Sequence, residues 1–240
     1  MILSAVVISK KAVLDDRLTT SLNFADEVLV IFSDTKSSAK PTKKFRYIFN
    51  KFTNFADQRN FGLKMAKGDW VFFVDTDEIV SKQLAKEIIK TIPKSNLDGY
   101  LVRRQDLVYH QILLHGESGD IKILRLAKRL VGKFSRDVHE KWLISAAIGE
   151  LVNPLYHQKD HFISEFLDRI CLYGPFDAYA LAKENKPFSL FRIIVNPMAK
   201  FVLNYFFKKG LLDGLPGLFQ AYLMSVQSLS VRVFQWEKKV

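Results

Sequence analysis

An α/β fold, with a mixed and mostly parallel sheet flanked by helices, is the architecture that this 240-residue sequence predicts. Two observations lead to it. Short apolar segments alternate with amphipathic ones through the first hundred residues, as in parallel strands joined by helices. The segment 70–74 is apolar throughout and rich in aromatic and β-branched residues, which is typical of a central strand covered on both faces.

The elements of the first half follow from their boundary residues. Asn54 and Ser81 are suitable N-caps, and Gly68 follows the last periodic residue of the helix that Asn54 begins. We expect strands at 2–9, 27–32, 45–49, 70–75 and 98–103, helices at 54–66 and 81–92, an amphipathic segment at 13–24, and short strands at 107–114, 121–126 and 141–144.

Helices are predicted from Ser164 onward. The helical spacing stalls at Gly174-Pro175, and Asn196-Pro197 predicts the start of a helix that ends before Gly210. Residues 214–231 then carry no charge over a length that touches the limit for a membrane span. Glycine and proline at its start and amides in its middle favour an amphipathic helix at a membrane interface instead.

The charge of the chain is concentrated near its C-terminus. The formal net charge is +11, and from residue 181 onward nine Lys and Arg residues face three acids. Because the same stretch is rich in Phe, Leu, Ile and Val, it predicts an anionic membrane surface as a partner, with an ordinary helical subdomain bearing solvated lysines as the alternative. No basic block has interleaved aromatics on a strand, so nucleic acid is not an expected partner.

The remaining composition narrows the class of protein. Cys171 is the one cysteine, which excludes an intrachain disulfide and a cysteine-based metal site and fits a reducing compartment. The apolar start, residues 1–9, has no basic segment before it and leads into lysines, so we interpret it as a strand and not as a signal peptide. A cytoplasmic location is expected.

Three carboxylates end the central apolar strand: Asp75, Asp77 and Glu78. In open α/β sheets the ligand crevice lies at the carboxyl ends of the strands. Two carboxylates separated by one residue can hold a hard divalent cation against the phosphates of a substrate. The alternative is a solvated turn with a helix-capping acid.

Several blocks, in order, resemble one enzyme family. They are Ala-Val-Val-Ile-Ser-Lys at 5–10, Phe-Ala-Asp-Glu-Val at 24–28, Gln-Arg-Asn-Phe at 58–61, Ala-Lys-Gly-Asp-Trp at 66–70, Val-Asp-Thr-Asp-Glu at 74–78, Asp120 to Leu126, Val-His-Glu at 138–140 and Gly-Leu-Leu-Asp-Gly-Leu-Pro-Gly at 210–217. Together the blocks resemble an inverting nucleotide-sugar glycosyltransferase of family 2 with a GT-A (Rossmann-like) fold. The similarity is greatest to the branch with lipopolysaccharide-core β-glycosyltransferases.

The resemblance implies roles for nine residues. It assigns the nucleotide sugar to Ser9, Asp34, Arg59, Asn60 and Asp75, and a Mg²⁺ or Mn²⁺ ion to Asp75 and Asp77 of the DXD motif. His139 is a candidate third metal ligand or phosphate donor, and a structural role is the alternative for it. A metal ion neutralises the departing diphosphate, and single displacement needs a general base for the acceptor hydroxyl. Asp120 is the first candidate for that base and Glu140 is the rival.

The resemblance also implies an organisation and a location. Residues 1–160 would be the catalytic domain, with a nucleotide half at about 1–105 and an acceptor half at about 106–160. Residues 161–240 would be a helical membrane-associating region. The expected enzyme lies on the inner face of the cytoplasmic membrane and transfers a hexose or heptose to a lipid-linked, oligosaccharide or lipopolysaccharide-core acceptor.

Two departures from the family pattern keep alternatives open. Phe32 stands where the family has the first Asp of its nucleoside-binding loop, and Lys11-Ala12 replaces the common Asn-Glu. A non-catalytic membrane-surface protein of the same fold is therefore one alternative. A phosphohydrolase with Asp75 as its nucleophile is another, although such enzymes usually carry the motif on their first strand. The sequence does not predict the oligomeric state.

Overall fold

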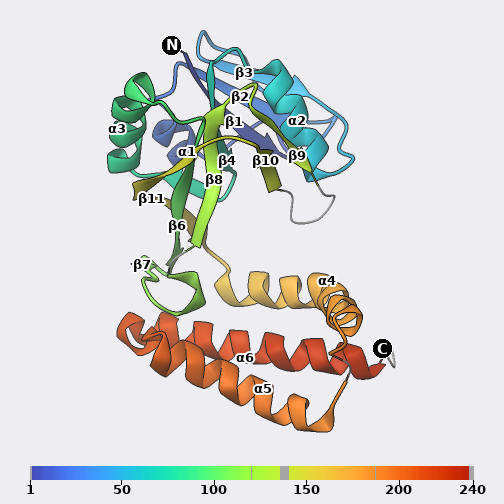
Figure 1. Ribbon diagram of the computed structural model, residues 1–240. Coiled ribbons are helices and arrows are strands. Elements are labelled where there is room, and N and C mark those ends of the chain that lie inside the picture. Colours follow the sequence, from blue (N-terminus) through green and yellow to red (C-terminus); the bar gives the residue numbers. More distant parts are fainter. Residues whose placement is uncertain (1, 120, 136–140, 187, 238–240) are drawn as a thin grey trace. The chain divides into compact units, whose positions relative to one another are not determined.

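The computed structural model describes residues 2–119, 121–135, 141–186 and 188–237 (Figure 1). By their contacts these residues form two compact units, one of residues 1–104 and 122–157 and one of residues 105–121 and 158–240. The second unit therefore takes 105–121 from the stretch that the sequence assigns to the acceptor half. The functional division that the sequence predicts stays a prediction.

The first unit is built on a mixed sheet in the order β3-β2-β1-β4-β8-β6-β11-β5, with β7 paired to β6. Parallel pairing joins β3, β2, β1 and β4, and antiparallel pairing joins β4 to β8 and β11 to β5. The strands are β1 Leu3–Ser9, β2 Glu27–Phe32, β3 Phe45–Phe49, β4 Trp70–Asp75, β5 Glu78–Val80, β6 Gly99–Val108, β7 Gln111–Ile112, β8 Ile121–Lys128, β9 Gly132–Ser135, β10 Lys141–Ile144 and β11 Ile148–Lys159, with β9 and β10 forming a separate pair.

Helices cover both faces of this sheet (Figure 1). On one face α1 (Asp16–Ser21) and α3 (Lys82–Thr91) pack with Trp70, Phe72 and Val74 in one apolar cluster. On the other face α2 (Phe55–Met65) packs with Val71 and Phe73 in a second cluster. Strand β4 is thus buried on both sides, as its uninterrupted apolar sequence predicts. The α/β class with a mixed, helix-flanked sheet is confirmed.

Local chemistry sets the helix boundaries in this unit. The side chain of Asn54 accepts a hydrogen bond from the Asp57 amide at 2.8 Å, and Ser81 accepts one from Leu84 at 3.0 Å, so both are the N-caps that the sequence predicts. A short 3₁₀ turn, η1 (Ile92–Lys94), follows α3.

The second unit is helical, as predicted, and carries a core of Val108, Leu113, Phe162, Phe166, Ile170 and Leu223. Its elements are η2 (Gly116–Ser118), α4 (Phe162–Lys183), α5 (Leu190–Val202), the π-helical turn η3 (Leu203–Phe207), η4 (Gly210–Asp213) and α6 (Gly214–Glu237). Helices α5 and α6 lie side by side, with the rings of Phe201 and Tyr222 4.6 Å apart (Figure 1).

Two predictions about these helices are wrong. Helix α4 runs through Gly174-Pro175, where Gly174 is buried beneath the ring of Phe234. Helix α5 begins at Leu190, after Ser189, and contains Pro197 in its interior. Proline removes one helical hydrogen bond and disfavours a helix interior without excluding it. Tertiary contacts hold α5 here, since the Ser225 hydroxyl donates to the Pro197 carbonyl at 2.8 Å.

Because β4 is buried on both faces, truncation of one of its side chains is expected to destabilise the protein strongly. Phe72 has no exposed surface and lies in the cluster beneath α1 and α3. Phe72→Ala is expected to lower the free energy of unfolding by about 3–5 kcal/mol, because it leaves a cavity. Phe55→Ala, at a ring that is 48% exposed on α2, is the matched control. Urea unfolding that gives equal losses for the two variants would contradict the burial of β4.

Candidate functional site

The carboxyl ends of the parallel strands meet at one edge of the sheet, as predicted. Ser9 of β1 is aligned with Phe32 of β2, and Ile8 is aligned with Asp75 of β4. The turn that follows Asp75 contains Asp77 and leads into β5 at Glu78. This edge therefore presents carboxylates where an α/β sheet usually binds its ligand.

Asp75 lies between two arginines. One carboxylate oxygen accepts a hydrogen bond from Arg59 Nη2 at 2.8 Å, and the other accepts from Arg125 Nη2. The same nitrogen of Arg125 donates to Glu78 Oε1 at 2.8 Å, and Glu78 Oε2 accepts from the Asp75 amide at 2.9 Å. Two carboxylates and two guanidiniums thus form one network, called here the Asp75 network.

Burial and neighbouring charges together set the pKa values of this network. Burial works against ionised Asp75, but Arg125 and Arg59 outweigh it and hold the pKa of Asp75 well below its usual range. Burial likewise works against charged Arg125, and Asp75 and Glu78 outweigh it to raise the Arg125 pKa. For Glu78, burial raises the pKa, Arg125 opposes that effect and Asp75 reinforces it.

Aromatic side chains form the apolar side of the site. The rings of Phe73, Phe134 and Trp142 contact one another, with centroids 4.9–5.2 Å apart. The guanidinium carbon of Arg59 lies 5.5 Å from the centroid of Phe73 and 5.6 Å from that of Phe134. These distances are those of a cation–π interaction, so the two rings help to hold the guanidinium that contacts Asp75.

A cavity of about 530 Å³ opens beside the Asp75 network. The described side chains that line it include one carboxylate, that of Asp75, and several cations, and the full lining is Arg59, Asp75, Arg104, Lys122, Ile123, Leu124, Arg125, Phe134, Lys141 and Trp142. Trp142 Nε1 and Arg125 Nε are buried donors with no hydrogen-bond partner among the residues that the structure describes. The cavity therefore combines positive charge, buried donors and an aromatic wall.

Asp77 has a partner that the sequence analysis missed. Its Oδ2 lies 3.0 Å from Nε2 of His157, a buried residue on β11. His157 is aligned with Glu78 where β11 pairs with β5. Asp77 and His157 are eighty positions apart, so no local spacing in the sequence could have indicated their contact. Strand pairing alone brings them together.

The other residues predicted to bind the nucleotide have hydrogen-bond partners within the protein. Asn60 exchanges two hydrogen bonds with the backbone of Phe134, at 2.8 and 2.9 Å, and so joins α2 to β9. Ser9 Oγ accepts from the Lys11 amide at 3.2 Å, and Asp34 accepts from the Lys36 amide at 2.9 Å. Of this set, Arg59 and Asp75 line the cavity. The nucleotide contacts of Ser9, Asp34 and Asn60 stay predictions.

Three predicted residues cannot be placed. Asp120, His139 and Glu140 lie outside the described residues.

Metal binding can be examined among the described side chains. No group of three or more described His, Cys, Asp or Glu side chains could hold a metal ion. Both oxygens of Asp75 contact arginines, while the Asp77 side chain is 51% exposed. The described donors thus fit a cation that takes most of its ligands from water and substrate phosphates, as Mg²⁺ commonly does.

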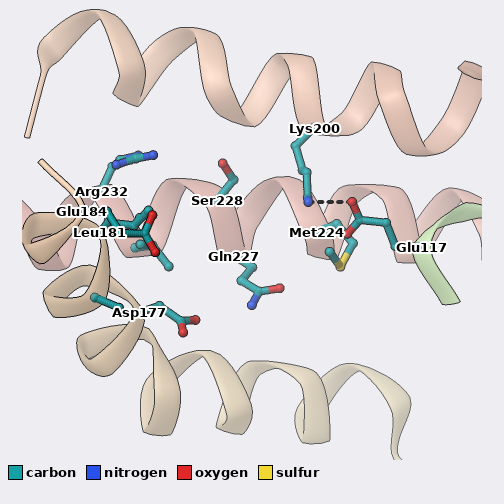
Figure 2. A pocket seen from close by; sticks show the side chains of 11 residues that line it. Glu117, Asp177, Leu181, Glu184, Lys200, Met224, Gln227, Ser228 and Arg232 are labelled. Carbon is teal, nitrogen blue, oxygen red and sulfur yellow. Dashed lines mark hydrogen bonds and ion pairs between the residues drawn. The ribbon is translucent and has the colours of Figure 1, made fainter. Parts of the chain in front are cut away.

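The described part of the chain has another cavity, of about 490 Å³, within the helical unit. Asp177 of α4, Lys200 of α5 and Gln227 of α6 are among its lining residues (Figure 2). None of the predicted site residues lines it. Predicted site residues, Arg59 and Asp75, do line the cavity beside Asp75.

The Asp75 network predicts a pH-dependent effect. Asp75→Asn is expected to lower the free energy of unfolding by about 3 kcal/mol at pH 7, because buried guanidiniums lose their anionic partner. The pKa of Asp75 is lower in the folded chain than in the unfolded one. Its contribution is therefore complete above about pH 4 and is lost as the pH falls further.

Urea unfolding at pH 7 and pH 3 tests this expectation. The difference between wild type and Asp75→Asn should narrow at the lower pH. Asp168→Asn, at an exposed position on α4, is the control and should show a small difference at both values. An Asp75→Asn effect that is equally large at pH 3 would contradict the ionic origin of the stabilisation.

Comparison with known proteins identifies the family of this chain. The sequence profile described as "Glycosyl transferase family 2" matches residues 13–134, which is half of the chain. An uncharacterised glycosyltransferase of Rickettsia typhi is 24% identical over 223 residues, covering 85% of this chain and 75% of the relative. The lipopolysaccharide core biosynthesis glycosyltransferase LpsC of Rhizobium meliloti is 23% identical over 197 residues, covering 79% and 73%.

Solved structures are similar over a larger share of the chain. TarS of S. aureus, residues 1–349 in complex with UDP, matches all of this chain and 92% of its own, at 15% identity and a TM-score of 0.48. The same protein in complex with UDP-GlcNAc matches 99% and 92%, at 17% identity and a TM-score of 0.48. The match of the family profile, which includes α2, β4 and Arg125, shows that this chain belongs to glycosyltransferase family 2.

Proposed function

We propose that this glycosyltransferase transfers a hexose or heptose from a nucleotide-sugar donor, with inversion and in one displacement. The cavity beside Asp75 carries the proposal. Its cationic lining suits a diphosphate, and its buried donors without described partners, Trp142 Nε1 and Arg125 Nε, suit phosphate or sugar oxygens. Family membership supports the sugar-transfer chemistry.

The roles of the described residues follow from their positions. Arg59 and Arg125 are oriented by Asp75, so that little side-chain entropy remains to be lost when a substrate binds. Lys141 adds positive charge to the lining where a diphosphate would acquire negative charge as it departs. Lys122 also lines the cavity, and its ammonium lies 2.7 Å from Glu150 Oε2. The wall formed by Phe134 and Trp142 excludes water from one side of the reacting centre.

A divalent cation, Mg²⁺ or Mn²⁺, is part of the proposal. Asp77 would hold it, with donor phosphates as further ligands, and His157 would orient the Asp77 carboxylate. When bound, the ion would act as a Lewis acid that stabilises the leaving diphosphate. The metal contacts predicted for Asp75 and His139 belong to this proposal, as does a general-base role for Asp120 or Glu140 in taking the proton from the acceptor hydroxyl.

The proposed acceptor is a lipid-linked, oligosaccharide or lipopolysaccharide-core saccharide at the inner face of the cytoplasmic membrane. The name of LpsC, a lipopolysaccharide core biosynthesis enzyme, supports this acceptor class. A catalytically inactive protein of the same family is the second candidate. It is favoured by Phe32, which is buried and packs on Phe49 where the family pattern has an aspartate.

A thermal shift screen tests the donor and the cation together. Sugar nucleotides with Mg²⁺ or Mn²⁺ are expected to raise the melting temperature of the wild type, because a ligand at 100 times its dissociation constant stabilises the native state by about 2.7 kcal/mol. Asp77→Asn should lose the part of the shift that depends on the metal. Asp98→Asn, which changes a carboxylate that contacts Lys128, is the control and should keep it.

The outcomes of the screen separate the two candidates. A metal-dependent shift for one donor, retained in the control variant, supports the transferase and identifies its sugar nucleotide. No shift for any sugar nucleotide, with or without metal, would contradict the proposal and favour the inactive protein.

A further inference from the structure

The segment 190–207 exposes an unusually large apolar surface for a helix of this length. By length and composition it could cross a membrane, yet 6% of it is buried. Leu190, Ile194 and Met198 repeat every fourth residue, so they lie along one side of α5. They are 73, 64 and 65% exposed, and Phe191 beside them is 72% exposed. These residues, with Phe206 and Phe207 of η3, are called here the α5 apolar face.

Polar contacts hold the other side of this segment to its own unit. Lys200 Nζ lies 2.7 Å from Glu117 Oε1, and the two side chains point toward each other in Figure 2. The Glu117 amide donates to Asn204 Oδ1 at 2.9 Å, and the Gly116 amide donates to the Lys208 carbonyl at 2.9 Å. Lys200 and Asn204 therefore lie on the side of this segment that faces its own unit, and Asn204 is buried.

This anchoring excludes a spanning orientation of α5 in the described fold. A helix that crossed a bilayer would carry Glu117 and Asn204 into the hydrocarbon, at a high free-energy cost. The turn after it is fixed as well, because Asp213 accepts hydrogen bonds from the amides of Leu114 and His115 at 3.1 and 2.8 Å. A helix held along one side can still present its other side to the plane of a membrane.

Charge identifies the occupant of this face. The stretch 186–209 carries Lys186, Arg192, Lys200, Lys208 and Lys209 and no acid. Lys186 precedes the α5 apolar face, and Lys208 and Lys209 follow it directly; all three are exposed. Lys186 lies 3.0 Å from Glu184 and Lys208 3.5 Å from Glu117, so the lysines next to the face still outnumber the acids that contact them. A second copy of the chain would bring two such positive segments together, whereas anionic phospholipids offer complementary charge beside an apolar layer.

We propose that the α5 apolar face inserts into the interfacial region of an anionic phospholipid bilayer, with α5 parallel to the membrane plane and the flanking lysines among the headgroups. The inference makes specific the membrane location in the proposed function, and it does not depend on the transfer chemistry. It also narrows the membrane contact, which the sequence predicts for residues 161–240, to α5 in place of the uncharged segment 214–231.

Vesicle co-sedimentation tests the proposal without donor or acceptor. The full chain should bind vesicles of phosphatidylcholine with a quarter phosphatidylglycerol at least tenfold better than vesicles of phosphatidylcholine alone. A variant with Phe191→Ser and Met198→Ser should lose at least tenfold in partitioning and keep its melting temperature, because both side chains are exposed. Leu130→Ser, at an apolar residue that is 83% exposed in the sheet-containing unit, is the control and should bind as the wild type does.

Two results would overturn the proposal. One is equal vesicle binding by the double variant and the wild type. The other is a dimer in light scattering that the double variant abolishes, with no vesicle binding by the wild type, which would assign the face to a second copy. Because neither measurement uses a sugar nucleotide, failure here is distinct from failure of the proposed transferase.

Discussion

The ion pair of Asp75 with Arg59 and Arg125 is the interaction on which the site depends. It joins α2 and β4, which are consecutive in the sequence, to β8, which is about fifty residues further on, at the edge of the sheet where ligands usually bind. Buried guanidiniums are costly without carboxylates, and a buried carboxylate is costly without them. Asp75 and Glu78 therefore allow the two guanidinium groups to stay charged and ordered beside the cavity in the absence of substrate.

Strand β4, which ends in Asp75, also organises the rest of the sheet-containing unit. Alternate residues of β4 pack against α1 and α3 on one face and against α2 on the other, so the position of Asp75 is fixed by two apolar clusters. Phe73 then contacts Phe134, Trp142 and Arg59. Apolar packing thus makes this edge of the sheet rigid, while Arg59 and Arg125 give it positive charge.

Much of the sheet-containing unit could be predicted from the sequence, because apolar periodicity and helix caps depend on residues close together in the chain. Strands at 27–32, 45–49, 70–75 and 141–144 and the N-caps Asn54 and Ser81 are confirmed. The contact of Asp77 with His157 could not be predicted from the sequence, because it depends on the pairing of β5 with β11, about eighty residues apart. Pro197 led to a wrong helix start, because the preference of proline for the first turn of a helix is only statistical. Tertiary contacts stabilise an α5 that begins earlier and contains Pro197 in its interior. Exposure of the α5 apolar face likewise depends on which side of the helix packs.

The central claim is that the cationic cavity beside Asp75 is a diphosphate site. Isothermal titration of the wild type and Lys141→Ala with a nucleoside diphosphate and the matching monophosphate, both with Mg²⁺, tests it most directly. Loss of one charge-assisted hydrogen bond is worth about 1.5–3 kcal/mol, so Lys141→Ala should weaken diphosphate binding by about tenfold or more. The account predicts that the diphosphate binds the wild type more tightly than the monophosphate does. Equal affinities for the two nucleotides, unchanged in the variant, would contradict it.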